Sequence, residues 1–177
     1  MIAIDCDGVI ANPYHEINYH IKMAGYDVTP PDEWTKFATY DEYTDVPKKF
    51  IQSLYRQRVV MKNAIPYADT WHWIRHLYFT QDESFEIITA RIPPLIKTTA
   101  NWCDDWHIPV EKVHHARDKH DFLHEIGGCK LFVEDSPKNA KLAAAAGHRS
   151  YLINRSYNVG EDAGDAIRID SVWEIEV

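Results

Sequence analysis

The stretch KLFVEDSPKNAKLAAAAG, residues 130–147, contains a strand, a turn and a helix in succession. Its first four residues form a largely apolar strand, and the acids Glu134 and Asp135 follow at the carboxyl end of that strand. Ser136 is a typical N-cap residue, and Pro137 suits the first helical position because that position needs no backbone N–H. The alanine-rich body ends at a glycine, which readily adopts the left-handed conformation found after helices. This stretch therefore predicts a strand–helix unit with two acids at the end of its strand.

The rest of the chain repeats this alternation of strands and helices. We expect strands at 1–6, 85–89, 110–114 and, as the last strand, 150–153. We expect helices at 14–23, 47–60, 68–78, 94–106 and 118–126, whereas residues 25–45 are irregular, aromatic and acidic. Strict alternation predicts an α/β fold with a doubly wound parallel sheet. In such sheets ligands bind beyond the carboxyl ends of the strands.

The composition narrows the classes of partner. The chain has 177 residues, of which 45% are hydrophobic and 26% are charged, as in a globular protein with a sizeable core. Its net charge of -8 argues against a polynucleotide or an anionic membrane as partner. We find no apolar stretch of the roughly 20 residues that a membrane-spanning helix needs, and no signal-peptide pattern. We expect a cytoplasmic protein that binds small molecules, and the sequence leaves its oligomeric state open.

The cysteines and histidines give no disulfide or metal pattern. Cys6, Cys103 and Cys129 are odd in number and lie far apart, which is typical of a reducing compartment. His120 and His124 lie four residues apart on an expected helix, a spacing that can bind metal, but no third ligand lies nearby. We interpret these two histidines as exposed or capping residues.

Acidic and polar side chains follow the ends of several expected strands. Because the carboxyl ends of parallel strands meet at one edge of a sheet, these side chains should lie close together. Carboxylates crowded there repel one another unless a cation is present, and an all-oxygen set suits Mg²⁺. Gly8 permits the tight turn that brings Asp7 back towards this site. The set comprises Asp5, Asp7, Thr89, Lys119, Glu134 and Asp135.

Four segments resemble the motifs of the haloacid dehalogenase-like (HAD) hydrolase superfamily. The first motif resembles IDCDGVI at 4–10, the second IITAR at 87–91, the third Lys119, and the fourth FVEDSPKNAKLAAAAG at 132–147. The resemblance covers most of the chain, apart from the middle of the stretch between the first two core strands. It implies a HAD-like Rossmannoid core and a phosphatase with Mg²⁺ as its cofactor.

The resemblance implies a covalent mechanism. Asp5 would be the nucleophile that takes the phosphoryl group, and Asp7 would be the general acid and then the general base. Lys119 would neutralise charge on the phosphate and on the nucleophile. Arg91 either reaches the phosphate or pairs with an acid, and we favour the phosphate. The residues implied to bind phosphate are Thr89, the backbone of Ala90, Arg91 and Lys119.

The resemblance also implies a set of magnesium ligands. The ion would be held by Asp5, the main-chain carbonyl of Asp7, and Asp135. Glu134 would lie beside the ion or act through water. The chain departs from the family pattern at Asn139, where an acid is usual, but Glu134 can supply the missing negative charge.

The chain between the first two motifs is much longer than the roughly 30 residues of one crossover. The surplus resembles the small helical cap that many HAD phosphatases carry. We predict a cap at 13–64, hinged at Asn12–Pro13 and at 63–66, and a catalytic core made of 1–12 and 65–177. Most aromatic residues of the cap should fill its own core, and one or two should contact substrate. The candidates are Tyr14, Tyr19, Trp34, Phe37, Tyr40, Tyr43, Arg56 and Arg58.

Short segments and the aromatic cap favour a nucleotide as the small phosphorylated substrate. HARDK at 115–119, RSYN at 155–158 and IRIDSVWEI at 167–175 resemble parts of cytosolic 5'(3')-deoxyribonucleotidases. A planar base can also stack on aromatic side chains. We therefore expect a phosphatase that acts on (deoxy)nucleoside monophosphates. The fourth motif is equally similar to sugar-phosphate phosphatases and β-phosphoglucomutases, so those alternatives stay open, as does a catalytically idle binding protein on this fold.

Overall fold

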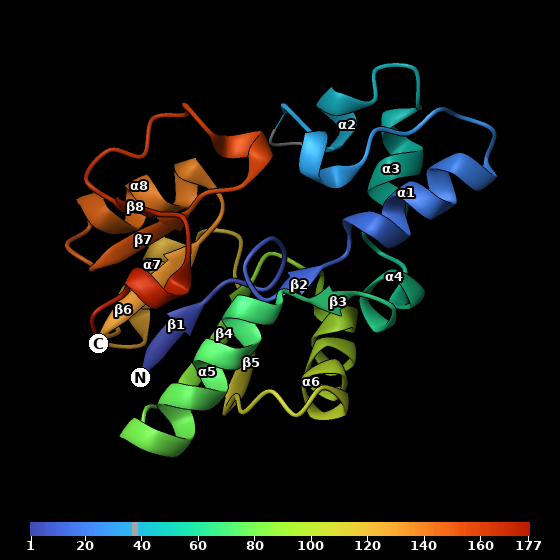
Figure 1. Ribbon diagram of the computed structural model, residues 1–177. Coiled ribbons are helices and arrows are strands. Elements are labelled where there is room, and N and C mark those ends of the chain that lie inside the picture. The colour runs from blue at the N-terminus through green and yellow to red at the C-terminus, as the bar shows by residue number, and fades with distance from the viewer. Residues whose placement is uncertain (37–38) are drawn as a thin grey trace.

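The centre of the computed structural model, which describes residues 1–36 and 39–177, is a six-stranded parallel sheet with helices on both faces (Figure 1). The strand order is β5-β4-β1-β6-β7-β8, and all neighbouring strands are parallel. The six strands are β1 (Ile2–Ile4), β4 (Phe85–Thr89), β5 (Lys112–His115), β6 (Leu131–Glu134), β7 (Ser150–Ile153) and β8 (Ile167–Ile169). The predicted α/β fold with a doubly wound parallel sheet is confirmed.

Four helices cover the sheet. They are α5 (Ala68–Gln81), α6 (Ile96–Asp105), α7 (Lys119–Glu125) and α8 (Pro137–Ala145). Successive residues of a strand point to opposite faces, so each strand contributes to two cores. Ile4 and Val133 belong to the core that α5 and α6 cover, whereas Ala3 and Phe132 belong to the core under α7 and α8.

The order of the strands places a crevice beside β1. From β1 the chain builds β4 and β5 on one side, and then crosses to build β6, β7 and β8 on the other. Ile4 is level with Ile87 of β4 and with Val133 of β6. Asp5, Thr89 and Glu134 therefore leave the sheet at the same edge, at the point where the strand order reverses. Ligands of doubly wound sheets bind at this position.

The prediction that Ser150–Ile153 is the last strand is wrong. β8 pairs with β7 as a further edge strand, and Tyr151 is level with Ile167. β8 has only three residues with the charged Arg168 at its centre, so its apolar pattern is too short to indicate a strand in the sequence.

The prediction of one helix over 47–60 is also wrong. The structure has two short helices, α3 (Lys48–Leu54) and α4 (Arg58–Lys62), and Gln57 between them is extended. Leu54 and Val60 are both buried in the same hydrophobic cluster. Because no glycine or proline lies between these helices, tertiary packing sets the break.

Residues 14–62 form a helical part beside the sheet (Figure 1). Its elements are α1 (Tyr14–Met23), the 3-10 helix η1 (Pro31–Glu33), α2 (Thr39–Glu42), α3 and α4. They surround a second core that includes Ile17, Trp34 and Ile51. At its base, β2 (Ala11–Asn12) pairs antiparallel with β3 (Ile65–Pro66). This ribbon lies where we placed the hinges, and the division of the chain at 13–64 stays a prediction.

Three further 3-10 helices complete the fold. They are η2 (Pro93–Leu95), η3 (Ser156–Asn158) and η4 (Val172–Glu174). Within the described ranges, no helix has both the length and the apolar character that crossing a membrane requires.

Candidate active site

The carboxyl ends of β1, β4 and β6 open into a cavity of about 480 Å³, which we call the catalytic cavity. Its size suits a small-molecule ligand. The predicted site residues come from four separate segments of the chain, and all of them line it. They are Asp5, Asp7, Thr89, Ala90, Arg91, Lys119, Glu134 and Asp135.

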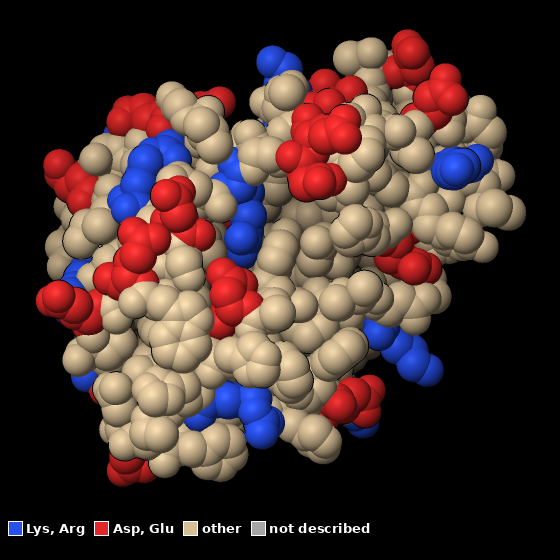
Figure 2. Space-filling view, in the orientation of Figure 1, with Lys and Arg blue, Asp and Glu red and all other residues tan. Residues whose placement is uncertain are grey.

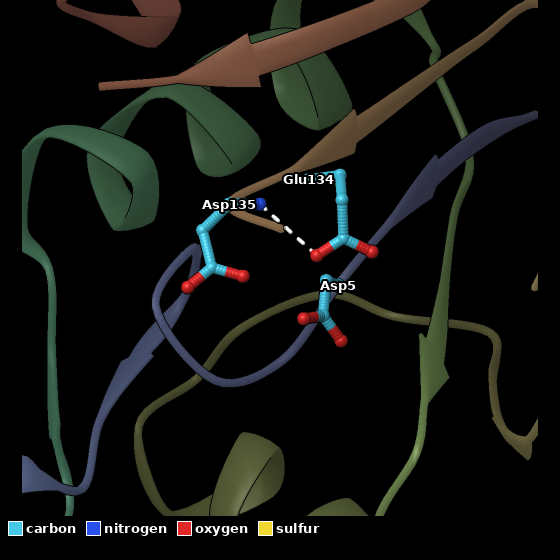
Figure 3. A group of neighbouring side chains, drawn as sticks. All are labelled: Asp5, Glu134 and Asp135. Atoms are coloured by element: carbon cyan, nitrogen blue, oxygen red, sulfur yellow. Dashed lines mark hydrogen bonds between the residues drawn. The ribbon is translucent and has the colours of Figure 1, made fainter. Parts of the chain in front are cut away.

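Three acidic side chains meet at the base of this cavity. Figure 3 shows the side chains of Asp5, Glu134 and Asp135 lying close together at the ends of two neighbouring strands. One ligand oxygen from each lies within 4.8 Å of the others, and all three residues are buried. Among the described residues, this is the one group of three or more acid, histidine or cysteine side chains with a spacing suited to a metal ion.

Burial raises the pKa of Asp5 and of Asp135 well above their usual range, and the negative charge of Glu134 raises both further. The three carboxylates therefore repel one another when they are charged, and a cation between them would relieve this repulsion. An all-oxygen donor set of this kind fits Mg²⁺. The donor chemistry thus agrees with the predicted cofactor.

Lys119 supplies positive charge inside the acidic group. Its Nζ lies 2.6 Å from Asp5 Oδ1 and 2.7 Å from Glu134 Oε2. Burial would lower the pKa of Lys119, but the two carboxylates raise it above its ordinary value, so the side chain stays cationic. Asp118 is the N-cap residue of α7, and Lys119 begins that helix, which fixes the lysine at the edge of the sheet.

Glu134 is fully occupied by contacts within the protein. Its Oε1 accepts hydrogen bonds from the backbone N–H groups of Asp135 and Ser136, both at 3.0 Å (the first is drawn in Figure 3). Its Oε2 accepts from Lys119 and, at 3.2 Å, from the amide of Asn139. Burial would raise the pKa of Glu134, but Lys119 and these donors lower it. Glu134 therefore acts first as a fixed negative charge that holds the lysine.

Asp135 approaches the backbone of the first motif at Gly8. A Cβ atom on Gly8 would lie 1.8 Å from Asp135 Oδ2, and the φ of Gly8 is +81°. Only glycine satisfies both conditions without strain. The same Oδ2 atom accepts a hydrogen bond of 2.7 Å from the hydroxyl of Tyr157, which leaves the other oxygen of Asp135 without a hydrogen-bond donor among the described residues.

Arg91 pairs with Asp7 across the cavity. Its Nε donates to Asp7 Oδ2 over 2.8 Å, and a terminal nitrogen contacts Oδ1. Burial would lower the pKa of Arg91, but Asp7 raises it above the ordinary value. Of the two roles left open for Arg91, the structure shows the pairing with an acid, and contact with phosphate stays a prediction. The side chain of Asp7 is thus engaged by Arg91, and the predicted metal contact of Asp7 involves its main-chain carbonyl.

Thr89 ends β4 with its side chain almost completely buried at the cavity. Its Oγ accepts a hydrogen bond of 3.2 Å from the backbone N–H of Arg91. This bond curls the chain at the end of the strand and places Ala90 on the cavity wall.

The helical part contributes few side chains to the cavity. Of the predicted contact residues, Tyr14 and Arg56 line it, whereas Trp34 and Tyr43 are buried in the helical core. Tyr19 and Arg58 are exposed and lie outside the lining. Phe37 and the side chain of Tyr40 lie outside the described residues.

Sequence reasoning missed several residues of the site. Gln52 and Tyr55 of the α3 segment line the cavity beside Arg56, and no motif marks them. Tyr157 and Asn158 fix the loop of the fourth motif, because the Asn158 amide donates to the Asp135 carbonyl over 2.8 Å. The resemblance at RSYN, residues 155–158, is the sequence signal for these two residues, although it indicates no structural role for them.

Searches against protein-family models and against curated protein sequences found no match. The search of solved structures did find similar chains. A HAD-family hydrolase from Deinococcus radiodurans R1, crystallised with bound phosphate and sodium, has 15% identity and a TM-score of 0.67, with 98% of this chain and 91% of that chain covered. The chain has the HAD fold.

Two further solved structures have the same fold. A predicted phosphoglycolate phosphatase from Haemophilus somnus 129pt has 14% identity and a TM-score of 0.61, covering 97% of this chain and 93% of that chain. A putative β-phosphoglucomutase from Thermotoga maritima has 12% identity and a TM-score of 0.60, covering 95% and 93%. None of the three is described as a nucleotidase, so that part of the resemblance stays a prediction.

Proposed function

We propose that this protein is a phosphomonoesterase that acts through an aspartyl-phosphate on Asp5 and uses Mg²⁺. The observation that carries the proposal is the balance of charge in the catalytic cavity. Four carboxylates, those of Asp5, Asp7, Glu134 and Asp135, face two buried cations, Arg91 and Lys119. A phosphate dianion enters such a cavity only if a further cation accompanies it.

The residues support two displacement steps in sequence. In the first, an Asp5 carboxylate oxygen bonds to phosphorus while the bond from phosphorus to the alcohol oxygen breaks. Asp7, which takes up a proton when the substrate binds, gives that proton to the departing oxygen. In the second, Asp7 takes a proton from water, the water oxygen bonds to phosphorus, and the bond between phosphorus and Asp5 breaks. Inorganic phosphate leaves, and both acids return to their starting state. Splitting the displacement in this way replaces one difficult step with two easier ones.

Three groups would stabilise the charge that these steps involve. Lys119 lies against the nucleophile Asp5, and Thr89 with the backbone of Ala90 would hold phosphate oxygens. Mg²⁺ would be held by Asp5, the main-chain carbonyl of Asp7, and Asp135. Glu134 would add negative charge beside the ion, because hydrogen bonds already occupy both of its oxygens. When bound, the ion would offset the repulsion between the carboxylates and the phosphate.

Replacement of the nucleophile tests this mechanism. Asp5→Asn keeps the shape of the side chain but removes its charge and nucleophilicity. We expect hydrolysis of an aryl phosphate to fall by about a thousandfold or more, equivalent to about 4 kcal/mol in the barrier. The exposed Asp121→Asn is the matched control and should behave as the unaltered protein. Near-normal turnover by Asp5→Asn, with its fold verified by circular dichroism, would contradict the mechanism.

A mutase on the same fold is the main alternative. A mutase must keep water away from its aspartyl-phosphate, whereas a phosphatase must admit water. Gln52 and Arg56 line the catalytic cavity and are themselves exposed to solvent, which favours the phosphatase. We expect free phosphate as the product. Isomerisation of a hexose phosphate without release of phosphate would establish the mutase instead.

We infer that the substrate is a nucleoside monophosphate, of the deoxy type. The lining of the cavity supports this proposal, because Tyr14 and Tyr55 bring aromatic side chains to it and Gln52 brings an amide that can pair with a base edge. Stacking on an aromatic side chain contributes about 1–3 kcal/mol per base. A sugar phosphate gains less from such a surface.

A comparison of substrates tests the nucleotide proposal. We expect kcat/KM for deoxynucleoside monophosphates to exceed that for glucose 6-phosphate and glycerol phosphate. Gln52→Ala should narrow this difference, while the exposed Gln81→Ala at the end of α5 serves as the control. If the sugar phosphates match every nucleotide tested, the substrate is wrong and the phosphatase mechanism still stands.

A further inference from the structure

A second cavity, of about 430 Å³, lies at the junction between the helical part and the sheet. We call it the hinge cavity, and it is nearly as large as the catalytic cavity. Its walls come from β2, from the first turn of α1, from η1, from Tyr67 just after β3 and from the segment after β7. The polar side chains on these walls include Asn12, His15, Asp32, Tyr67, Arg155 and Ser156. Figure 2 shows basic side chains beside a hollow between the two parts of the molecule.

Arg155 is the cation of the hinge cavity and is only partly used by the protein. Its guanidinium stacks on the ring of Tyr67, with Cζ 3.8 Å from the ring centre, and its Nε donates to the Gly8 carbonyl over 2.7 Å. Its Nη2 is buried and has no hydrogen-bond partner, and Arg155 forms no ion pair with any described residue. A buried donor without an acceptor is costly, so the site lacks an acceptor that a ligand would supply.

The neighbours of Arg155 do not supply this acceptor. Asp32 is the acidic residue of the lining, but it is exposed and makes no ion pair with Arg155. Tyr67 offers the face of its ring and holds the guanidinium flat, which preorganises its N–H groups. A guanidinium fixed in this way matches the geometry of an oxyanion.

We propose that the hinge cavity is a second ligand site, and that it binds a small molecule through a phosphate or carboxylate group placed on Arg155. His15 and Asn12, at the start of the helical part, would border the rest of the ligand. This site is distinct from the catalytic cavity, because no charged side chain is shared between the two linings.

Occupation of the hinge cavity would be transmitted to the catalytic loop through contacts that already exist. Arg155 is bonded to the carbonyl of Gly8, which lies between Asp7 and the loop that ends at the ribbon. Tyr157, on the same wall, donates a hydrogen bond from its hydroxyl to Asp135. A ligand that accepts a hydrogen bond from Arg155 would therefore shift the backbone at Gly8, next to Asp7.

A titration observed by NMR tests the proposal, with inorganic phosphate as one probe and malonate as the other. We expect at least one probe to shift the Arg155 Nε–H and His15 ring signals in a saturable way. The Ala90 amide reports binding in the catalytic cavity separately. Phosphate active and malonate inactive identifies a phosphate ligand, the reverse identifies a carboxylate, and two inactive probes overturn the proposal.

Two variants and a control complete the test. Arg155→Gln should abolish the His15 shift while the Ala90 shift remains. His15→Glu keeps Arg155 and its bond to Gly8, suits the first turn of a helix, and should weaken binding several-fold by repulsion. Arg149→Gln is the matched control, because Arg149 also lies over a tyrosine ring but lines neither cavity. Undiminished His15 shifts in Arg155→Gln, or undiminished Arg155 Nε–H shifts in His15→Glu, would overturn the assignment, even if catalysis in the first cavity is fully established.

Discussion

The guanidinium of Arg91 contacts both oxygens of the Asp7 carboxylate, and the distance between Nε and Oδ2 is 2.8 Å. The two residues lie on different strands' ends, and the arginine is almost completely buried. A paired contact of this kind fixes the direction of a carboxylate as well as its charge. Arg91 therefore determines where Asp7 points when a substrate arrives.

The first prediction follows from this pair. In Arg91→Gln, Asp7 loses its two-point contact and its orientation. We expect kcat for an aryl phosphate to fall by about 10- to 100-fold, because a misplaced proton-transfer group affects the chemical step. KM should change much less. Steady-state kinetics on the purified variant measures both parameters.

Arg58→Gln is the control for this prediction, because Arg58 is exposed on the helical part and outside the cavity. A large rise in KM with an unchanged kcat would show instead that Arg91 mainly binds the phosphate of the substrate.

The second prediction concerns magnesium and stability. Burial and mutual repulsion raise the pKa of Asp5 and Asp135, so a cation that binds the folded state should stabilise it. At a Mg²⁺ concentration of a hundred times Kd, we expect Tm to rise by about 5–10 °C. A chelator should reverse the rise, and Asp135→Asn should remove most of it. Thermal unfolding followed by circular dichroism gives these values; equal shifts in Asp135→Asn and Asp121→Asn would place the ion elsewhere.

The third prediction compares two glycines with similar backbone conformation. The φ of Gly8 is +81° and that of Gly25 is +90°, but a Cβ on Gly25 would meet nothing within 4 Å. Gly25→Ala should therefore show only the backbone cost, about 1–2 kcal/mol. Gly8→Ala adds the clash with Asp135, so we expect about 1–3 kcal/mol more, together with weaker Mg²⁺ binding. Urea denaturation and a Mg²⁺ titration measure the two effects. Equal losses of stability in both variants would show that the contact with Asp135 is easily relieved.

The fourth prediction concerns alkaline pH. Burial raises the pKa of Tyr67 to about 12 and raises the pKa values of Tyr14 and Tyr157 well above their usual range. Because these groups bind their protons more tightly when folded, their contribution to stability is complete below about pH 10 and is lost as pH rises through the folded pKa. We expect these tyrosines to stay protonated in the folded protein at pH values where exposed tyrosines have ionised.

Absorbance of tyrosinate in the near ultraviolet tests this expectation. Tyr157→Phe should leave the titration of the folded protein near pH 10 unchanged, but should reduce the absorbance gained on denaturation at high pH. A loss of native titration amplitude in Tyr157→Phe would show that its hydroxyl ionises while the protein is folded.

Much of the catalytic cavity could be predicted because its reactive residues lie in short segments directly after strands. The acids after β1 and β6 lie beside one another because the register of parallel strands aligns their carboxyl ends. Strand, N-cap and helix in 130–147 are local properties, and the structure shows Ser136 accepting from the Asn139 backbone as an N-cap should. Strands, caps and helices that depend on neighbouring residues in this way can be predicted without a structure.

The pairings inside the cavity were less predictable, because they depend on which side chains face one another after folding. Glu134 contacts Lys119 across fifteen positions of the sequence, and nothing in its motif separates a metal ligand from a lysine partner. Gln52 and Tyr55 reach the cavity because a helix breaks where packing requires it. β8 escaped prediction because three residues around an arginine carry little periodicity.

The ribbon of β2 and β3 would allow the helical part to be exchanged for another segment. Ala11 is paired with Pro66 and Asn12 with Ile65, so the chain departs from the sheet and returns to it at adjacent points. Segments whose two ends lie close together can be exchanged with little disturbance to the scaffold that carries them. The helical part is thus in the position of an exchangeable module: a transplanted segment of another length would alter which molecules are selected, while the strand register that sets the acids stays the same.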